Sequence, residues 1–230
     1  MNRNLRNPIL HRDDPDREPL AGNVKVTRQD WLDTAMDVLI QDGVDQVKIL
    51  ALAEAMGVSR SSFYWYFGSR QDLLDALLNH WQKRNTAAMV AQAEAPAQTI
   101  TAAVCNVFRC TVNPALFDTA LDFAIRDWAR REESVRDLLH ASDGAREAAL
   151  TAMFARYGYP GPEAETRAKV LYYMQLGYDF AGRPEPAQTR LDRVPEYLRI
   201  FTGREPQHGE FEEFAAYAHS FQSFAETGDT

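Results

Sequence analysis

The chain has 230 residues, of which 45% are hydrophobic and 25% are charged, and its formal net charge at pH 7 is -8. This acidic balance argues against a protein that coats nucleic acid without sequence preference. The chain contains no run of about eighteen apolar residues, and its first residues lack the apolar segment of a signal peptide. We therefore expect a cytoplasmic protein that does not enter the membrane.

The negative charge is concentrated in the second part of the chain. Residues 1–84 carry 11 Lys and Arg against 12 Asp and Glu, whereas residues 85–230 carry 14 against 21. The first part is thus nearly neutral, and the position of its basic residues decides whether it can contact DNA.

No motif for catalysis or metal binding is found. The five histidines have no metal-ligand spacing, and no phosphate-binding loop or set of nucleophile and base is present. Cys105 and Cys110 point roughly 140° apart on a helix, so we expect buried free thiols rather than a disulfide. These observations predict a protein that is not an enzyme, with no catalytic residue, no metal and no cofactor.

Residues 1–23 are predicted to be a flexible tail. They contain Pro8, Pro15 and Pro19, alternating charges and almost no periodic apolar pattern. Two interpretations of Arg3 and Arg6 stay open, an arm that enters a DNA minor groove or a solvated charged segment.

The first predicted helix begins after Thr27 and ends at Gly43. Thr27 and Asp30 have the spacing of a capping box. An apolar stripe follows, formed by Leu32, Ala35, Met36 and Leu39. We expect this helix to pack across the next two helices and to set the angle between them.

Residues 48–67 have the pattern of two short helices joined by a glycine turn. Residues 48–56 carry apolar side chains at helical spacing, and Gly57 can adopt the positive φ of a sharp reversal. Ser59 then stands where it can cap a helix over residues 60–67. This pattern predicts a helix-turn-helix, in which the second helix enters the major groove.

Five successive aromatic residues, 63–67, are unusual for a core helix. In a helix Phe63 and Phe67 lie on one face, whereas Arg60, Tyr64 and Trp65 lie on the opposite face. Only one aromatic pair can be buried. The other pair should face outward with the arginine, as in a contact surface.

A further helix begins at Ser69 and is predicted to continue to Ala95, where Pro96 ends it. Arg70 lies in its first turn beside the free backbone N–H groups, which is a suitable place for a phosphate. Because this helix connects the predicted DNA-reading part to the rest of the chain, it can act as a lever.

These segments together resemble the TetR-type (TetR/AcrR) transcriptional repressors. The matching residues are Thr27, Asp42–Gly43, 52–59, 63–67 and 69–74. The family usually has Thr where this chain has Lys48 and often a basic residue where it has Leu50. The resemblance implies an all-α fold, with a three-helix DNA-binding domain over residues 24–85 and a larger regulatory and dimerisation domain over residues 86–230.

The second part of the chain also has a helical pattern. Helices are predicted near residues 100–113, 115–131, 133–157, 163–180, 191–201 and 210–224, and no alternating strand pattern competes with them. By resemblance, the helices at 163–180 and 191–201 would form a four-helix dimer interface with a second copy.

Three sets of site residues are predicted. The DNA contacts are Lys48, Arg60, Ser61, Ser62, Tyr64, Trp65, Tyr66 and Arg70, with Arg60 assigned to a guanine edge, Lys48 and Arg70 to phosphates, and the tyrosines to phosphates by resemblance. The ligand contacts are Phe108, Phe117, Asp122, Phe123, Arg126, Trp128 and Tyr172. The dimer contacts are Tyr173, Met174, Tyr178 and Tyr197. For the aromatic residues of the last two sets, simple packing in the core is the alternative.

We therefore expect a homodimeric repressor that a small-molecule effector of unknown identity releases from a pseudo-palindromic double-stranded DNA operator. The alternatives are a DNA-binding protein without an inducer and a helical protein-interaction module whose helix-turn-helix no longer binds DNA. Leu50 and the acidic balance favour the last of these.

Overall fold

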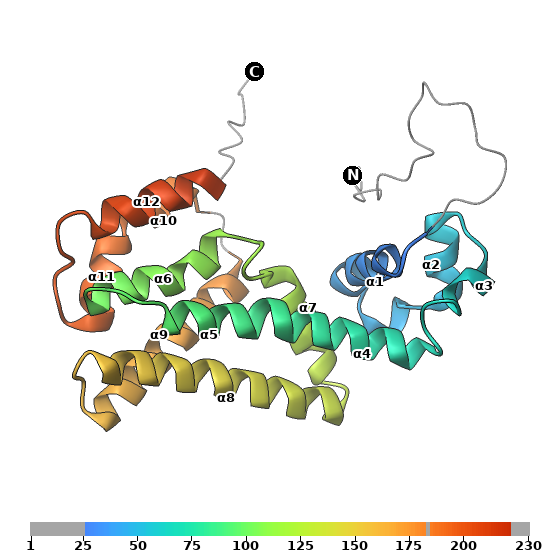
Figure 1. Cartoon of the computed structure of the whole chain (residues 1–230), viewed down its shortest axis with the longest axis horizontal. Helices are drawn as coiled ribbons and strands as arrows, with labels where there is room; N and C mark the ends of the chain where they lie inside the picture. Colours follow the sequence, from blue (N-terminus) through green and yellow to red (C-terminus); the bar gives the residue numbers. More distant parts are fainter. Residues whose placement is uncertain (1–25, 183–184, 222–230) are drawn as a thin grey trace, which may run out of the picture. The chain divides into compact units, whose positions relative to one another are not determined.

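The computed structural model describes residues 26–182 and 185–221, and every regular element in this part of the chain is a helix (Figure 1). The all-α prediction is therefore confirmed. The chain divides into two compact units between His80 and Trp81. The predicted tail over residues 1–23 lies outside the described residues, as do residues 222–224 of the last predicted helix.

The first unit is built around three short elements that follow a capped helix. It contains α1 (Arg28–Asp42), the 3-10 helix η2 (Val44–Gln46), α2 (Ile49–Met56), α3 (Arg60–Phe63) and most of α4 (Arg70–Trp81). The predicted capping box at the start of α1 is present, since Thr27 accepts from the backbone N–H of Asp30 and the Asp30 carboxylate accepts from that of Thr27.

Buried aromatic rings hold the first unit together. Trp31 of α1 meets the edge of Phe63 with ring centroids 5.1 Å apart, and Phe63 stacks on Phe67 at 5.3 Å. All three side chains are buried together with Leu52 and Met56 of α2. Edge-to-face and offset-stacked rings add to the hydrophobic burial, so this cluster fixes α3 against α1 and α2.

The second unit begins at Trp81 and continues through nine further elements. These are the π-helix η3 (Gln82–Thr86), α5 (Ala87–Glu94), α6 (Ile100–Val112), α7 (Thr119–Ala129), α8 (Glu133–Arg156), α9 (Gly161–Ala181), α10 (Ala187–Asp192), α11 (Val194–Thr202) and α12 (Glu210–Phe221). Helix α5 packs against both α6 and α8, α9 packs along α8, and α12 covers α6 (Figure 1). Their shared core is one hydrophobic cluster centred on α6, α8 and α9.

Three predicted helices have different bounds in the structure. The helix expected over residues 60–67 ends at Phe63, because the following N–H groups bond to carbonyls three residues back and tighten the chain into a turn. The helix expected from residue 115 begins at Thr119, with Asp118 as its cap. The helix expected over 191–201 is divided into α10 and α11, with Pro195 in the first turn of α11.

The helix expected to continue to Ala95 is interrupted by η3. Asn85 of η3 is buried, and its side chain bonds to both the backbone N–H and the carbonyl oxygen of Asp118. A π-helix inserts an extra residue into a turn and frequently marks a functional position. Here it turns a polar side chain inward to anchor the start of α7.

Both cysteines are free thiols buried in α6, as expected. Burial raises the pKa of Cys105 and of Cys110 to about 12, so both stay protonated at neutral pH. Within the described residues, no helix combines the length and the apolar character that crossing a membrane requires.

Candidate nucleic-acid interface and regulatory cavity

The turn between α2 and α3 has the geometry of a helix-turn-helix. Gly57 adopts φ 67° and ψ 33°, the left-handed conformation that glycine tolerates best, and the N–H of Val58 bonds back to the carbonyl of Ala53 at 3.0 Å. Ser59 then precedes α3 in extended conformation. Its carbonyl oxygen, rather than its hydroxyl, accepts from the N–H of Ser62.

The five aromatic residues divide as predicted into a buried pair and an exposed group. Phe63 and Phe67 are buried, whereas Tyr64 is 49% exposed and Trp65 is 85% exposed. Because the helix ends at Phe63, the turn through Tyr66 carries the outward-facing rings. A nearly bare tryptophan on a well-packed unit is the clearest sign of a contact surface in this part of the protein.

Arg60 is held on this exposed surface by Tyr64. Its Nη2 donates to the Tyr64 hydroxyl at 3.1 Å, and its guanidinium lies 5.9 Å from the centre of the same ring. A guanidinium has five N–H donors, and this contact uses one of them. The pair therefore leaves most of the arginine donors available for base edges or phosphate.

The two serines that follow differ in their contacts. The hydroxyls of Ser59 and Ser61 lie 2.9 Å apart on the surface, whereas the hydroxyl of Ser62 donates to the carbonyl of Ser59 at 2.7 Å. Lys48, at the start of α2, is exposed, and its Nζ donates to Gln46 at 3.2 Å. Ser62 thus contributes to the turn, while Ser61 and Lys48 face solvent.

Two predicted phosphate contacts are already bonded to the backbone of the first unit. The Tyr66 hydroxyl donates to the carbonyl of Val26 at 2.5 Å. Arg70 donates from Nε to Val47 at 2.6 Å and from Nη2 to Val44 at 2.7 Å. These bonds give both side chains a positioning role, and a contact with phosphate stays a prediction for each.

Arg28 is a candidate DNA contact that the sequence interpretation missed. It is the exposed first residue of α1, and its guanidinium lies 4.7 Å from the centre of the Phe67 ring. A cation at a helix N-terminus is electrostatically unfavourable. A basic residue in the first turn of a predicted helix was therefore the sequence signal that could have identified Arg28.

In the second unit, five of the seven predicted ligand residues line one small cavity. Its volume is about 40 Å³, and it lies between α5, α6, α7, α8 and α9. We call it the central cavity. The five residues are Phe108, Phe117, Asp122, Phe123 and Tyr172. Arg126 and Trp128 do not line it.

The polar wall of the central cavity is a buried network of charges. Arg146, fully buried in α8, donates to Asp122 at 3.0 Å, to the Tyr172 hydroxyl at 3.1 Å and to Thr86 at 3.1 Å. Arg126 donates to Asp122 at 2.8 Å and to both oxygens of Asp143. The two arginines balance the two aspartates, which makes their burial tolerable.

This network also bonds to the beginning of the second unit. The indole Nε1 of Trp81 donates to Asp122 at 2.8 Å, and the Arg146 guanidinium lies 5.2 Å from the centre of the Trp81 ring. Burial alone would raise the pKa of Asp122, but Arg146 and Arg126 outweigh it and hold that pKa below its ordinary value. Asp122 is therefore a carboxylate at neutral pH.

Sequence interpretation missed Arg146, although a signal was present. Buried residues of α8 recur at Val135, Leu139, Ser142, Arg146 and Leu150, so the arginine lies on the buried stripe of the helix. Trp128, in contrast, is buried in α7 and donates from Nε1 to Glu132 at 2.7 Å. Its role in the structure is core packing and not contact with the cavity.

The predicted dimer residues do not share one surface. Met174, Tyr178 and Tyr197 line a second cavity inside the unit, whereas Tyr173 is exposed. The exposed large apolar side chains of α9 and α11 are instead Val170, Tyr173, Phe180 and Ile200. Residues 170, 173 and 180 share one face of α9. The dimer interface itself stays a prediction.

An α2–turn–α3 unit braced by α1 defines a helix-turn-helix domain. Residues 32–77 match the family model of bacterial regulatory proteins of the tetR family. This part of the first unit is therefore similar to the tetR family of regulatory proteins. It is 34% identical over 58 residues to the HTH-type transcriptional regulator TtgW of Pseudomonas putida, which is 25% of this chain and 43% of that protein. The matched segment thus spans less than half of the curated relatives' length.

Two solved structures resemble almost the whole described fold. The TetR family transcriptional regulator PfmR of Thermus thermophilus has a TM-score of 0.60 at 17% identity, covering 80% of this chain and 99% of that one. The ketosteroid transcriptional regulator KstR2 of Mycobacterium tuberculosis also has a TM-score of 0.60, at 16% identity, covering 82% and 99%. At this identity the likeness concerns the fold alone.

Proposed function

We propose that this protein is a homodimeric, sequence-specific DNA-binding transcriptional regulator of the cytoplasm and not an enzyme. The observation that carries the proposal is the exposed surface formed by Arg60, Ser61, Tyr64 and Trp65. It combines a cation with spare donors and a hydroxyl on the short helix α3 with two aromatic rings on the turn that follows it. Such a surface suits base edges and the sugar–phosphate backbone in a major groove.

The net charge of the whole chain does not conflict with this function. Most of the excess acidic residues lie beyond residue 84, and the described basic residues of the first unit include Arg28, Lys48 and Arg60, all exposed. Because exposed charges farther apart than about 10 Å are largely screened at 0.1 M salt, the local charge of the surface matters most. A few phosphate contacts plus base contacts then favour specific over non-specific binding.

The experiment is a selection of binding sites from random duplex DNA with the full chain, followed by gel shifts on the selected sequence. Trp65→Ala should weaken binding by about tenfold or more, because burying a large apolar side chain is worth about 1.5–3 kcal/mol. Gln41→Ala, an exposed residue of α1, is the matched control and should bind normally. If no sequence is enriched over random DNA, the protein-interaction alternative, which the 58% exposed Leu50 favours, replaces this proposal.

We further propose that the regulator is a repressor released by a small molecule bound at the central cavity. The cavity of about 40 Å³ is far below the roughly 300–1,000 Å³ of typical ligand sites. A ligand must therefore move helices apart to enter, which means that it favours a different conformation of the second unit. Differential affinity of this kind is the thermodynamic requirement for release.

The charged residues that line the central cavity can couple ligand binding to release from DNA. Asp122 and Arg146 line the cavity and also bond to Trp81 and Thr86, which lie at the end of α4 and in η3. A ligand that displaces either charge must break these bonds. The strain then acts on the helix that begins at Arg70 in the DNA-reading unit.

A thermal-shift screen of apolar and amphipathic metabolites, followed by operator titration with each hit, tests this proposal. A ligand that favours the released state a hundredfold should weaken operator binding by about 2.7 kcal/mol, and operator DNA should weaken ligand binding equally. If operator binding is specific and no hit alters it, the DNA-binding protein without an inducer is the correct alternative.

A further inference from the structure

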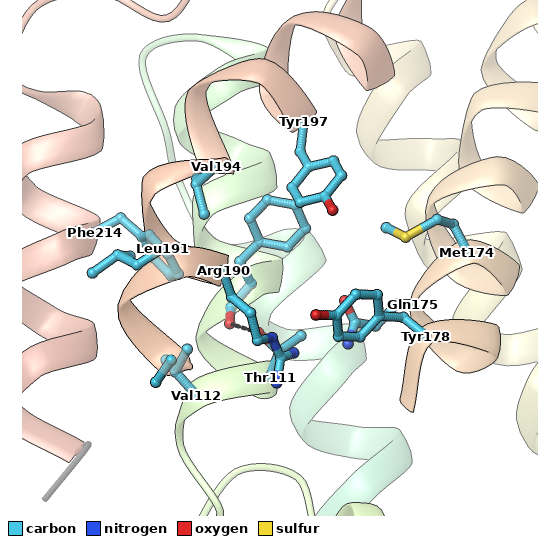
Figure 2. Close-up of a pocket in the computed structure, with 12 residues that line it drawn as sticks. Thr111, Val112, Met174, Gln175, Tyr178, Arg190, Leu191, Val194, Tyr197 and Phe214 are labelled. Atoms are coloured by element: carbon cyan, nitrogen blue, oxygen red, sulfur yellow. Dashed lines mark hydrogen bonds between the residues drawn. The ribbon is translucent and has the colours of Figure 1, made fainter. Parts of the chain in front are cut away.

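A second cavity, of about 70 Å³, lies between α6, α9, α10, α11 and α12 (Figure 2). We call it the lateral cavity. Phe108, Thr111 and Gln175 line both cavities and so form the partition between them. The lateral cavity shares no other lining residue with the central cavity, and none of its lining residues belongs to the charged network of Asp122 and Arg146.

The inner end of the lateral cavity is apolar and buried. Phe108, Leu191 and Phe214 line it and are almost fully buried. The ring of Phe108 packs against Phe201 and Phe214 at centroid distances of 6.3 and 6.0 Å. This end therefore offers a dry space that fits hydrocarbon better than polar groups.

The outer end carries one charge. Among the described residues that line the cavity, Arg190 alone is of a charged type, and its side chain is 40% exposed. Its guanidinium lies 4.6 Å from the centre of the Tyr178 ring, which fixes its direction. Figure 2 shows the Arg190 and Tyr178 side chains next to each other, with Tyr197 above them in this view.

Arg190 is only weakly paired within the protein. The nearest carboxylate oxygen, on Asp179, is 4.0 Å from its Nη2, and Asp179 lines the central cavity rather than the lateral one. A contact at that distance is at the outer limit of an ion pair and leaves the guanidinium fork free for a bidentate partner. The matching partner of such a fork is a carboxylate.

We propose that the lateral cavity binds a short-chain organic carboxylate, with the head group on Arg190 and the hydrocarbon tail against Leu191 and Phe214. An apolar cavity of about 150 Å³ holds the six carbon atoms of benzene, so 70 Å³ accommodates a tail of about three carbon atoms. This site is distinct from both the DNA-reading surface and the central cavity. It requires neither of the proposed functions to be correct.

The direct test is a titration of the full chain with acetate, propanoate and butanoate, observed by ligand NMR. Affinity should increase about fourfold with each added methylene, as expected for burying that group. Butan-1-ol and butylamine have the same tail with a neutral and a cationic head. Both should bind at least about tenfold more weakly than butanoate, because the uncharged alcohol oxygen cannot accept both bonds of the guanidinium fork and an ammonium group accepts none.

Two variants locate the site. Arg190→Gln should weaken butanoate binding by about tenfold or more while binding of butan-1-ol stays the same. Arg193→Gln is the control, since Arg193 is an exposed arginine one residue after α10 that pairs with Glu185 and does not line the cavity. Ala187→Phe adds a ring at a partly exposed lining position and should also abolish binding of butanoate.

Three results would overturn the proposal. The first is equal affinity for butylamine and butanoate, which would show that Arg190 does not recognise the head group. The second is unchanged butanoate affinity in Arg190→Gln, which would place the ligand elsewhere. The third is no saturable binding of any carboxylate. The chain-length series and Arg190→Gln keep the test decisive even if Ala187→Phe fails to fold.

Discussion

Recognition of the DNA sequence should depend mainly on Arg60. Its single internal bond to Tyr64 orients it without using its other donors. Arg60→Ala should cost about 1–3 kcal/mol on the selected operator and relax the preference at one base pair. Arg60→Lys is the conservative comparison, because it retains the charge but loses the bidentate geometry. Equal losses on operator and random DNA would instead assign Arg60 to phosphate.

Variants of Lys48 and Arg70 should distinguish a residue that contacts DNA from a residue that positions the DNA-binding surface. Lys48 is exposed, so Lys48→Ala should weaken binding to all sequences, lower the salt slope by about one unit and leave stability unchanged. Arg70 bonds to the carbonyls of Val44 and Val47. Arg70→Ala should also lower the free energy of unfolding by about 1–3 kcal/mol. Urea denaturation with parallel gel shifts at several salt concentrations measures both effects. An Arg70 variant of normal stability would show that its internal bonds contribute little.

At the scale of elements, the buried charges join α7 and α8 to the start of the second unit. Arg146→Met removes one partner and leaves Asp122 buried beside Trp81. Breaking a buried pair in this way costs about 3–5 kcal/mol. Arg136→Met, an exposed position of the same helix, should change stability by less than about 0.5 kcal/mol. A small effect of Arg146→Met on urea unfolding would mean that water reaches Asp122.

Asp122 and Asp179 should respond to pH in opposite directions. The folded pKa of Asp122 is lowered, so its contribution to stability is complete above about pH 4, the unfolded value, and is lost as the pH falls further. Burial raises the pKa of Asp179, so Asp179 destabilises the fold above its folded pKa and this cost is relieved on acidification.

The corresponding asparagine variants test these signs. Asp122→Asn should lower stability at pH 7, by an amount that shrinks toward about pH 3. Asp179→Asn should raise stability at pH 7, by an amount that also shrinks as the pH falls toward about 4. Denaturation curves of both variants and the parent chain, recorded from about pH 3 to 8, give the differences. Two variants with the same sign at pH 7 would contradict this assignment.

At the scale of the whole molecule, dimerisation is expected to use the exposed apolar face of α9. Val170 and Phe180 lie on this face, and Phe180 is 73% exposed. Introducing Val170→Arg and Phe180→Arg together should halve the mass in light scattering, from about twice 26.1 kDa to 26.1 kDa. Lys169→Ala, next to this face, is the control.

The same pair of substitutions should abolish protection of a two-half-site operator, because two recognition helices about 34 Å apart are needed to occupy successive major grooves. Footprinting of the parent chain should show two protected half-sites with that spacing. Protection of one asymmetric half-site by a monomer would exclude the homodimeric mechanism.

Local sequence signals correctly predicted the features that neighbouring residues control. The sequence signals for the capping box at Thr27, the left-handed Gly57 and the division of residues 63–67 into buried and exposed rings each lie within about four residues along the chain. The helical class and the resemblance to the TetR family followed from the same local patterns, because turn and cap residues at fixed spacing are specific.

Contacts between distant segments could not be read from such patterns. The bonds of Arg146 to Thr86, Asp122 and Tyr172 span between 24 and 60 residues. A helical period shows that Met174 and Tyr178 lie near one another, but only packing against α10 and α11 turns them toward a cavity and leaves Val170 and Phe180 outside. Whether a side chain is buried or exposed depends on which helix packs over it. The order of the helices along the chain does not specify which of them pack together, so only the tertiary structure decides this.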